Sequence, residues 1–321
     1  MRLFVIVAYH QAELLDIACV SDTLDAANQL RAAPPYRIRL ATPGGAPVTC
    51  GSGLTLAGQE SLERLQGPLD TLLVVGGPGS ERAAKDPRIV GHVRRLARES
   101  RRVASVCTGA EVLAATGLLD GRRATTHWAY AEGIAGRHPE VAFDSGPIFI
   151  QDGPIATAAG VTSALDLTLK LIEDDHGADL ARWVARGLVT YLQRPGDQRQ
   201  MSMFVAAPPP EHDLVRKLTA YVTSHLDADL SAAALANRAG VGERHLARLF
   251  AEHAGQSPAR YVRAARLEAA AHLLSSTGLP VAAVARRCGF RSAETFRQSF
   301  VDRYGVAPTH FRSASTRHAP G

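Results

Sequence analysis

The apolar positions of this chain follow two different patterns, which change near residue 210. In the first part, short apolar runs alternate with longer amphipathic stretches. Four short runs are predicted to be strands: Leu3–Ala8, Arg37–Ala41, Thr71–Val75 and Arg102–Val106. Stretches such as Ile17–Arg31 and Arg88–Ser100 are predicted to be helices. Three of the four runs are nearly all apolar, as strands covered on both faces are, so the pattern predicts a doubly wound α/β domain with a mostly parallel sheet.

After residue 210 the strand pattern stops, and apolar residues recur at helical spacing. This part also repeats itself with a period of fifty residues. The pairs fifty apart are Leu246 and Phe296, Phe250 and Phe300, Gly255 and Gly305, Pro258 and Pro308, and Tyr261 and Phe311, while Gly240 and Gly289 are forty-nine apart. Repetition at a fixed period indicates two copies of one supersecondary unit.

Each copy is predicted to form a helix, a tight turn and a second helix. In the first copy, Ser231 can cap a helix with Leu235 and Ala239 on its inner face, Gly240 forms the turn, and the next helix starts near Glu243. In the second copy the inner face and the turn consist of Val281, Val284, Ala285, Cys288 and Gly289. The second part is therefore predicted to be an all-α domain with two helix-turn-helix units.

The boundary between the two parts lies at Ala206-Ala207-Pro208-Pro209-Pro210-Glu211, where three prolines stiffen the backbone. A chain of 321 residues also exceeds one typical core. The predicted organisation is a first domain at 1–205, a linker at 206–213, a second domain at 214–312 and a disordered tail at 313–321.

The net charge of +5 is concentrated in the second part. From Glu211 onward, 15 Lys and Arg residues stand against 9 Asp and Glu residues, a surplus of +6. The first 210 residues carry 21 and 22, which leaves −1. A basic domain joined to a neutral one is typical of a nucleic-acid-binding module with an attached partner domain.

The second helix-turn-helix unit carries a family signature. The run Ala285-Arg-Arg-Cys-Gly-Phe-Arg-Ser-Ala-Glu-Thr-Phe-Arg-Gln-Ser-Phe300, followed by Gly305-Val-Ala-Pro308, resembles the AraC/XylS-type regulators over 214–312. The resemblance implies seven helices, with two recognition helices in successive major-groove segments about one helical turn apart. By position the residues that read double-stranded DNA would be Arg244, Ala247, Arg248, Glu294, Thr295, Arg297 and Gln298. Ala247 is too short to bond a base, and Gln298 stands where the family often has Arg, so the bases that are read stay open.

In the first domain, Cys107 follows the strand Arg102–Val106 and precedes a helix that opens at Thr108-Gly109-Ala110. A side chain at such a turn points out above the sheet, and a helix N-terminus favours a thiolate. Cys107 therefore has the setting of a nucleophile, although free cysteines are also among the most buried residues.

The segments around Cys107 resemble a known superfamily. Val74-Val-Gly-Gly-Pro-Gly79, Ser105-Val-Cys-Thr-Gly-Ala110 and Gly117-Leu-Leu-Asp-Gly-Arg-Arg-Ala-Thr-Thr-His-Trp128 are similar to the ThiJ/PfpI, glutamine-amidotransferase-like proteins, whose domain is flavodoxin-like. With the AraC-type domain behind it, the whole chain resembles the GlxA family of transcriptional regulators.

The superfamily resemblance also implies candidate site residues. By position Asp16 would be the acid beside Cys107, and amides around Gly77 and Thr108 would cradle an oxyanion or a ligand carboxylate. His127 is the available base, but the structural interpretation, a bond to the backbone, is favoured. Thr108 replaces the histidine of peptidase-like members, whereas the hydratases of the superfamily carry Thr there. Glu111 replaces a usual apolar residue, and either bonds the helix N-terminus or opposes a thiolate.

The preferred interpretation is a sequence-specific DNA-binding regulator that responds to a small metabolite held near Cys107 and Asp16. Amino acids and quaternary amines are the loosely implied class of effector. The alternative is a cysteine-dependent hydratase or amidase, which would have no need of the DNA-binding part. A redox sensor acting through Cys107 ranks last, because no resolving cysteine is evident among Cys19, Cys50 and Cys288.

The remaining expectations concern partners and location. The dispersed histidines predict no metal, and no cofactor is expected. The four cysteines show no disulfide framework and no apolar run spans a membrane, so a cytoplasmic protein is expected. A homodimer on paired DNA sites is predicted, and contact with RNA polymerase is compatible with this function.

Overall fold

The computed structural model describes residues 1–190, 196, 200 and 210–316, except for the side chains of 272, 275, 276 and 313–316. The chain divides into two compact units, Met1–Gln200 and Met201–Gly321. Each unit has its own hydrophobic cores, so each is described separately.

The first unit is built on a seven-stranded sheet with the order β10-β11-β7-β6-β1-β2-β5. Its strands are β1 (Arg2–Val7), β2 (Tyr36–Thr42), β5 (Glu60–Ser61), β6 (Leu69–Val74), β7 (Ser100–Val106), β10 (Phe149–Asp152) and β11 (Ile155–Ala158). All neighbouring pairs are parallel except β10 with β11. The four predicted strands and the mostly parallel sheet are therefore confirmed.

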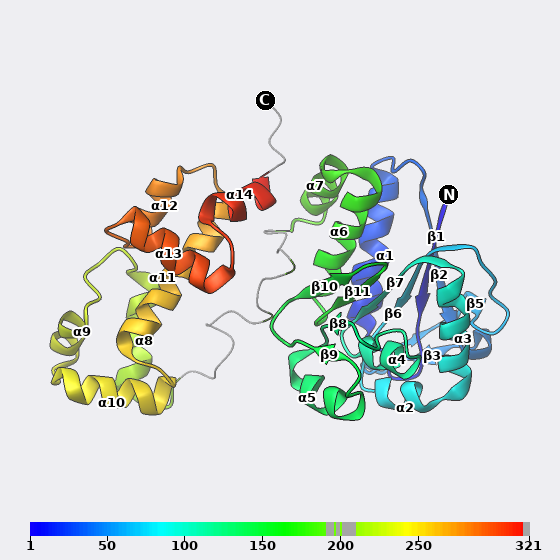
Figure 1. Ribbon diagram of the computed structural model, residues 1–321, viewed down its shortest axis with the longest axis horizontal. Coiled ribbons are helices and arrows are strands. Elements are labelled where there is room, and N and C mark those ends of the chain that lie inside the picture. The colour runs from blue at the N-terminus through cyan, green and yellow to red at the C-terminus, as the bar shows by residue number, and fades with distance from the viewer. Residues whose placement is uncertain (191–195, 197–199, 201–209, 317–321) are drawn as a thin grey trace. The chain divides into compact units, whose positions relative to one another are not determined.

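Helices cover both faces of this sheet (Figure 1). One face packs against α1 (Leu14–Gln29), α6 (Ser163–His176) and α7 (Ala178–Gly187), and the other against α2 (Ser80–Lys85), α3 (Pro87–Arg98) and α4 (Gly109–Ala115). Along β1, Phe4 and Ile6 enter the first core while Val5 and Val7 enter the second. Apolar residues at every position of a strand are needed because both faces are buried.

Short elements complete the first unit. They are the 3-10 turn Pro43–Gly45, β3 (Val48–Thr49), β4 (Thr55–Leu56), β8 (Arg123–Ala124), β9 (Ala142–Phe143) and α5 (Trp128–Arg137). At the end of the sheet opposite Cys107, the buried Asp175 of α6 binds Arg102 at 2.5 Å and Arg101 at 2.7 Å and accepts a hydrogen bond from Tyr36 at 2.8 Å. These contacts tie α6 to the beginnings of β7 and β2.

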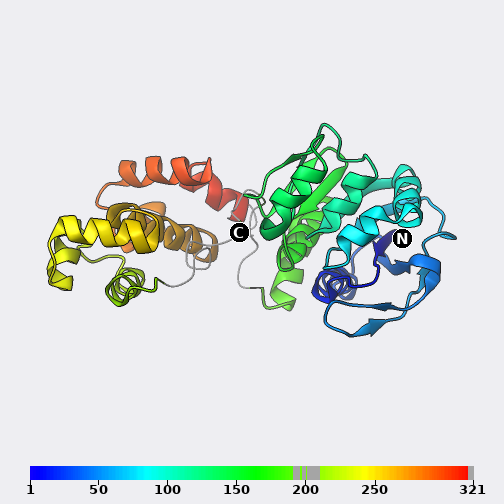
Figure 2. The ribbon, with the colours of Figure 1, turned by 90° about the horizontal axis from the view of Figure 1, so that it is seen from below.

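The described residues of the second unit form helices only (Figure 2). The helices are α8 (Asp213–Ser224), α9 (Ala232–Ala239), α10 (Glu243–Ala254), α11 (Pro258–Ser276), α12 (Val281–Arg287), α13 (Ala293–Tyr304) and α14 (Pro308–Thr316). The long α11 contributes Val262 and Ala265 to one core and Leu267, Ala270 and Leu274 to a second. Two helix-turn-helix halves thus share one connecting helix.

The fifty-residue repeat has a direct structural meaning. Phe250 and Phe300 are both fully buried, and each makes an edge-to-face contact with its partner in the same half, Tyr261 at 5.9 Å and Phe311 at 5.2 Å. The glycines that end α10 and α13 are both left-handed, with φ of 65° and 75°. The repeated residues are therefore core contacts and helix ends.

The structure describes parts of the predicted linker at 206–213 and of the predicted tail at 313–321. Residues 206–209 of the predicted linker lie outside the described residues, and Asp213, its predicted last residue, is the first residue of α8. The predicted disordered tail begins at Ser313, but α14 continues to Thr316, because the helix that starts at Pro308 continues past Phe311, which anchors it in the core. Residues 317–321 lie outside the described residues.

Candidate functional site

Cys107 occupies a strained turn between β7 and α4. Its φ is +54°, a value that residues with a Cβ rarely adopt. The backbone is held on two sides, because the Cys107 N–H donates to the Ala158 carbonyl at 3.0 Å and its carbonyl accepts from Thr126 Oγ1 at 2.9 Å. The surroundings therefore impose the sharp strand-to-helix turn that the sequence predicts.

The thiol of Cys107 is protonated in this setting. Burial and the charge of Asp16 raise its pKa to about 12, against weaker lowering by hydrogen bonds from Thr108. The sequence analysis expects the helix N-terminus to favour the thiolate, and here the structure differs. The reason is that the side chain is only 6% exposed and faces a carboxyl group.

Asp16 lies in the first turn of α1 and is fully buried. Its Oδ2 accepts a hydrogen bond from the Gly76 N–H at 2.9 Å, whereas Oδ1 has no partner among the described residues. Burial raises the pKa of Asp16 to about 7. The carboxyl group therefore changes its charge near neutral pH and has one oxygen left to bond a ligand.

The glycine loop after β6 packs tightly against this turn. The Gly77 N–H donates to Thr108 Oγ1 at 2.9 Å, and Thr108 Oγ1 donates back to the Gly77 carbonyl at 3.0 Å. A Cβ at Gly76 would lie 2.6 Å from the Cβ of Cys107, so only glycine fits there. The Gly77 amide is thus already bonded within the protein, and the Thr108 amide faces the Cys107 sulfur. That amides around these two residues cradle a ligand stays a prediction.

His127 caps α5. Its Nδ1 accepts a hydrogen bond from the Ala129 N–H at 3.3 Å, and its ring stacks on Trp128 with centroids 5.7 Å apart. Burial lowers the pKa of His127, which keeps the ring neutral. This is the backbone-bonding role that the sequence analysis favours over a catalytic base.

Two further groups complete the surroundings of Cys107. Glu111 is buried, and its two carboxyl oxygens accept hydrogen bonds from Arg137 Nε at 2.8 Å and from Ser80 Oγ at 3.2 Å. Tyr9, which the sequence analysis missed, donates its hydroxyl to the Val75 carbonyl at 2.7 Å, and burial together with the charge of Asp16 raises its pKa. The signal for Tyr9 was its place just after β1, at the carboxyl edge of a parallel sheet, where ligands bind in such folds.

The second unit presents two exposed helix faces at equivalent positions of the repeat. Ser231 caps α9 by accepting from the Ala234 N–H at 3.2 Å, and Ser292 caps α13 by accepting from the Thr295 N–H at 3.3 Å. The turns before α10 and α13 contain left-handed glycines, Gly240 at φ +66° and Gly289 at φ +78°. The exposed side chains are those of Arg244, Ala247, Arg248, Glu294, Thr295, Arg297 and Gln298.

The two exposed faces differ in how their polar groups are engaged. Arg248 lies 3.1 Å from His245 Nδ1 on α10, a contact without a formal opposite charge. On α13, Arg297 is paired with Glu294 at 2.7 Å, and Gln298 donates to Asp302 at 2.8 Å. The first face is therefore more open to a polyanion than the second.

Within the described residues, no group of three His, Cys, Asp or Glu side chains gathers as a metal site would require. The same residues contain no helix with the length and apolar character needed to cross a membrane. All four cysteines are free.

Comparison with known proteins agrees with this architecture. Residues 1–174 match the DJ-1/PfpI family, and residues 235–314 match a helix-turn-helix domain. The HTH-type transcriptional regulator CdhR of Pseudomonas aeruginosa is 33% identical over 89% of this chain and 84% of its own length. The HTH-type transcriptional regulator GlxA of Rhizobium meliloti is 32% identical over 94% of this chain and 93% of its own.

Other relatives resemble the first unit. The isonitrile hydratase of Pseudomonas putida is 33% identical over 55% of this chain and 73% of its own length. The crystal structure of a ThiJ/PfpI family protein from Pseudomonas syringae superposes with a TM-score of 0.56 at 22% identity, covering 70% of this chain and 86% of that protein. The structural likeness supports the fold of the first unit.

Proposed function

The chain belongs to the DJ-1/PfpI family and to the HTH-type transcriptional regulators, and from this premise we propose that it binds promoter DNA through α10 and α13 under the control of a metabolite held near Asp16 and Cys107. The observation that carries the DNA-binding part is the equivalence of the two helix-turn-helix halves around α11. Each half exposes the face that would enter a major groove.

The residues that we propose contact DNA bases are the exposed side chains of α10 and α13. Arg244 and Arg248 on α10 and Arg297 on α13 are long enough to reach base edges, whereas Ala247 can make only an apolar contact. Glu294 can accept from cytosine, and Thr295 and Gln298 can bond several bases. Because Arg297 is paired with Glu294 in the free protein, base contact there requires an exchange of partners.

The test is capture of sheared genomic DNA by the full chain at near-physiological salt, followed by sequencing of the retained fragments. The variant Arg248→Ala with Arg297→Ala removes one reading arginine from each face. Its matched control is Arg216→Ala with Lys217→Ala on α8, which removes the same charge outside the two faces. We expect a motif with two elements about one helical turn apart, lost in the first variant and kept in the control. Equal loss in both variants would mean that only net charge drives the binding.

The proposal of an effector site is based on Asp16 Oδ1, which is buried and has no hydrogen-bond partner among the described residues. A buried oxygen without a hydrogen bond is costly, and a ligand with a donor group would remove that cost. A ligand that binds two arrangements of the protein with different affinity then changes DNA binding. Amino acids, whose ammonium group can donate to Oδ1, are the compounds to test first, by their effect on DNA affinity. Quaternary amines have no N–H donor and would interact with an ionised Asp16 through charge alone, so they are tested second. Cys107→Ser and Asp16→Asn are expected to abolish the response and to leave effector-free DNA binding intact.

A second candidate function is isonitrile hydration by the first unit. Its support is the similarity to the hydratase together with the placement of Asp16, Cys107 and Thr108 at one edge of the sheet. The reaction adds one water to R–NC and yields the formamide R–NHCHO. The high pKa of the Cys107 thiol argues against an attacking thiolate in the free protein. Formamide production from an alkyl isonitrile, absent in Cys107→Ser, would establish the enzyme.

We also propose a cytoplasmic homodimer, because one module of this size binds DNA only modestly and paired sites would strengthen the interaction. Recruitment of RNA polymerase by DNA-bound protein belongs to the same proposal. Sedimentation with and without the captured DNA tests the assembly. A protein that stays monomeric at micromolar concentration in both conditions would contradict the dimer.

A further inference from the structure

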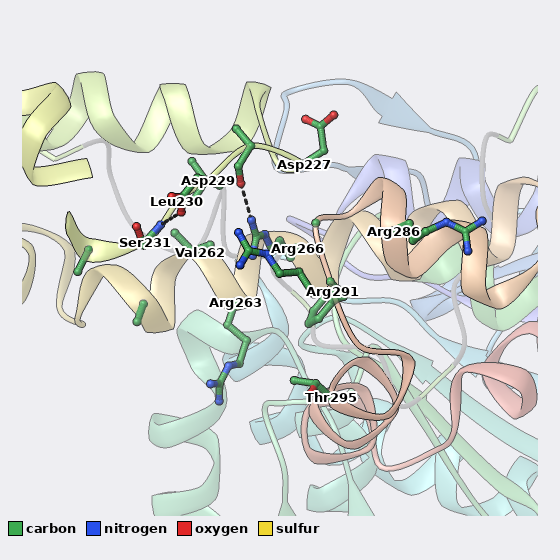
Figure 3. Close-up of a pocket in the computed structure, with 15 residues that line it drawn as sticks. Asp227, Asp229, Leu230, Ser231, Val262, Arg263, Arg266, Arg286, Arg291 and Thr295 are labelled. Atoms are coloured by element: carbon green, nitrogen blue, oxygen red, sulfur yellow. Dashed lines mark hydrogen bonds between the residues drawn. The ribbon is translucent and has the colours of Figure 1, made fainter. Parts of the chain in front are cut away.

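A groove of about 690 Å³ lies between the two helix-turn-helix halves (Figure 3). One wall is the loop before α9 and the start of α9, including Asp229 and Ser231. The floor is α11 with Arg263 and Arg266, and the other wall includes Arg291 and Thr295. The groove lies wholly within the second unit.

The groove carries a net positive charge, which its two acids offset only in part. Four arginines line it, Arg263, Arg266, Arg286 and Arg291, against two acids, Asp227 and Asp229. Asp229 already accepts a hydrogen bond from the Ser231 N–H at 3.0 Å. In the described part of the chain, none of the four arginines forms an ion pair, although many arginines elsewhere do. Such a groove favours an anion.

Arg266 is fixed in place by neutral groups. Its guanidinium donates to the carbonyls of Leu226 and Ala228, each at 2.9 Å, so its positive charge is positioned but not neutralised. The turn of the second half packs directly on it, because a Cβ at Gly289 would lie 2.7 Å from Arg266 Cζ and 2.1 Å from the Leu226 carbonyl oxygen. Arg266 therefore joins the loop of the first half to the turn of the second.

The guanidinium groups of the groove point in different directions. Figure 3 shows Arg266 and Arg291 directed toward the same part of the groove, while Arg286 points away from them. The charge of Arg291 contributes to lowering the pKa of Arg266, after burial, which agrees with two guanidinium groups close together. Hydrogen bonds from Ser231 lower the pKa of Asp229. The charges of Arg291 and Arg266 also help to lower the pKa of Asp229, so this one carboxylate offsets part of the charge of two guanidinium groups. A bound anion would offset the remainder.

The groove lies beside both DNA-facing parts of the unit. Thr295 lines the groove and also belongs to the exposed face of α13, and Ser231 caps the first helix of the other helix-turn-helix half. In such motifs the first helix crosses the DNA backbone while the second lies in the major groove. A duplex that engages α10 and α13 together would therefore bring its backbone to the mouth of this groove.

We propose that the groove binds a phosphate of the DNA backbone between the two major-groove segments, with Arg291 as the contact and Arg266 as the positioning residue. This inference rests on the proposed DNA-binding function and names a further part of that interface. The contact fixes register and orientation on the duplex and carries no base preference. It also makes binding depend on both halves at once.

The first test measures the affinity of the full chain for a captured motif duplex at several salt concentrations. Arg291→Gln removes one cation from the groove, and Lys217→Gln removes one from the exposed surface of α8. We expect Arg291→Gln to reduce the slope of log affinity against log salt by about 1 and to weaken binding about tenfold. Lys217→Gln should change binding less than about twofold and leave the slope unchanged. The preference for motif over mutated motif should stay the same in both variants.

The second test locates the phosphate. Duplexes carry a single uncharged methylphosphonate at each successive position between the two elements. The wild-type chain should lose affinity at one or two of these positions, and Arg291→Gln should be insensitive at the same positions. Equal sensitivity of both proteins at every position would overturn the proposal, as would an unchanged salt slope for Arg291→Gln.

A third arm distinguishes a DNA phosphate from a free anion. Calorimetric titration of the DNA-free protein with inorganic phosphate and pyrophosphate should show no saturable binding below millimolar concentration. Saturable binding that Arg291→Gln abolishes would assign the groove to a soluble anion and overturn the DNA contact. If the wild-type chain showed no motif preference at all, the DNA-binding function itself would fail. Motif binding without any Arg291 effect would refute only the groove.

Discussion

The two units of the chain keep their chemically active groups in opposite environments. Around Cys107, the side chains of Asp16 and Glu111 are buried and bonded to the protein, and the pKa values of Asp16 and Cys107 are raised. In the second unit, Arg248 and Arg297 are exposed. A buried ionisable group changes its charge when its surroundings change, whereas an exposed arginine stays charged and can reach a polyanion. The first environment is suited to responding and the second to binding.

If the units are separate in this way, a core defect in one should leave the other intact. Phe250→Ala and Phe300→Ala remove equivalent rings from the two halves of the second unit, and each should cost about 3–5 kcal/mol of its stability. Both tryptophans, Trp128 and Trp183, lie in the first unit, so their fluorescence reports that unit alone, while circular dichroism reports both. A shift of the fluorescence transition in either variant would show that the units unfold together.

The burial of Asp16 predicts a pH effect confined to the first unit. A carboxyl group whose folded pKa is raised from 3.8 to about 7 destabilises the fold as pH rises through this interval, since the unfolded chain ionises first. Relative to Asp16→Asn, the wild-type chain should lose up to roughly 4 kcal/mol between pH 4 and pH 8. The quantity to follow is how the difference in unfolding free energy between the two proteins changes with pH. Replacing the carboxyl group by an amide also has a cost of its own, but that cost does not depend on pH. Tryptophan fluorescence in urea measures it, and a pH-independent difference would contradict a buried, titrating Asp16.

The exposed arginines predict an effect on binding and not on folding. Arg248→Ala should lower affinity for the captured motif by about 1–3 kcal/mol, the usual value of a base contact, without changing the unfolding transitions. Fluorescence anisotropy with the motif and with a base-substituted motif measures it. Arg216→Ala is the control for charge, and an equal loss in the control would remove Arg248 from the reading face.

The smallest expected effect comes from the ion pair between Glu294 and Arg297 on the exposed face of α13. Glu294→Gln releases Arg297 from its 2.7 Å partner and removes a negative charge from the face of α13 that we propose binds DNA. Affinity for non-specific duplex should rise about threefold, with the gain diminishing at high salt. A fall in affinity for the motif alone would instead indicate that Glu294 itself contacts a base.

Much of the architecture was predictable from local patterns. The apolar runs of β1, β6 and β7 and the turn glycines Gly240 and Gly289 are readable because buried strands and left-handed turns restrict residue type directly. The fifty-residue repeat was readable because each half must fill a core of its own with the same arrangement of residues. The hydrogen-bond partner of the Gly77 amide could not be predicted in this way, because it is the side chain of Thr108, thirty-one positions away.

The amino-acid sequence by itself determined the two-part organisation, the elements and the residues of the two exposed helix faces of the second unit, since these follow from periodicity, turn chemistry and repeated core positions. Only the tertiary structure decided the ionisation of the Cys107 and Asp16 groups, the capping role of His127 and the unpaired arginines of the groove. The physical reason is that burial and electrostatic interaction are set by neighbours from distant segments. A helix N-terminus that favours a thiolate in isolation is outweighed once a carboxyl group and a dry environment surround the same sulfur.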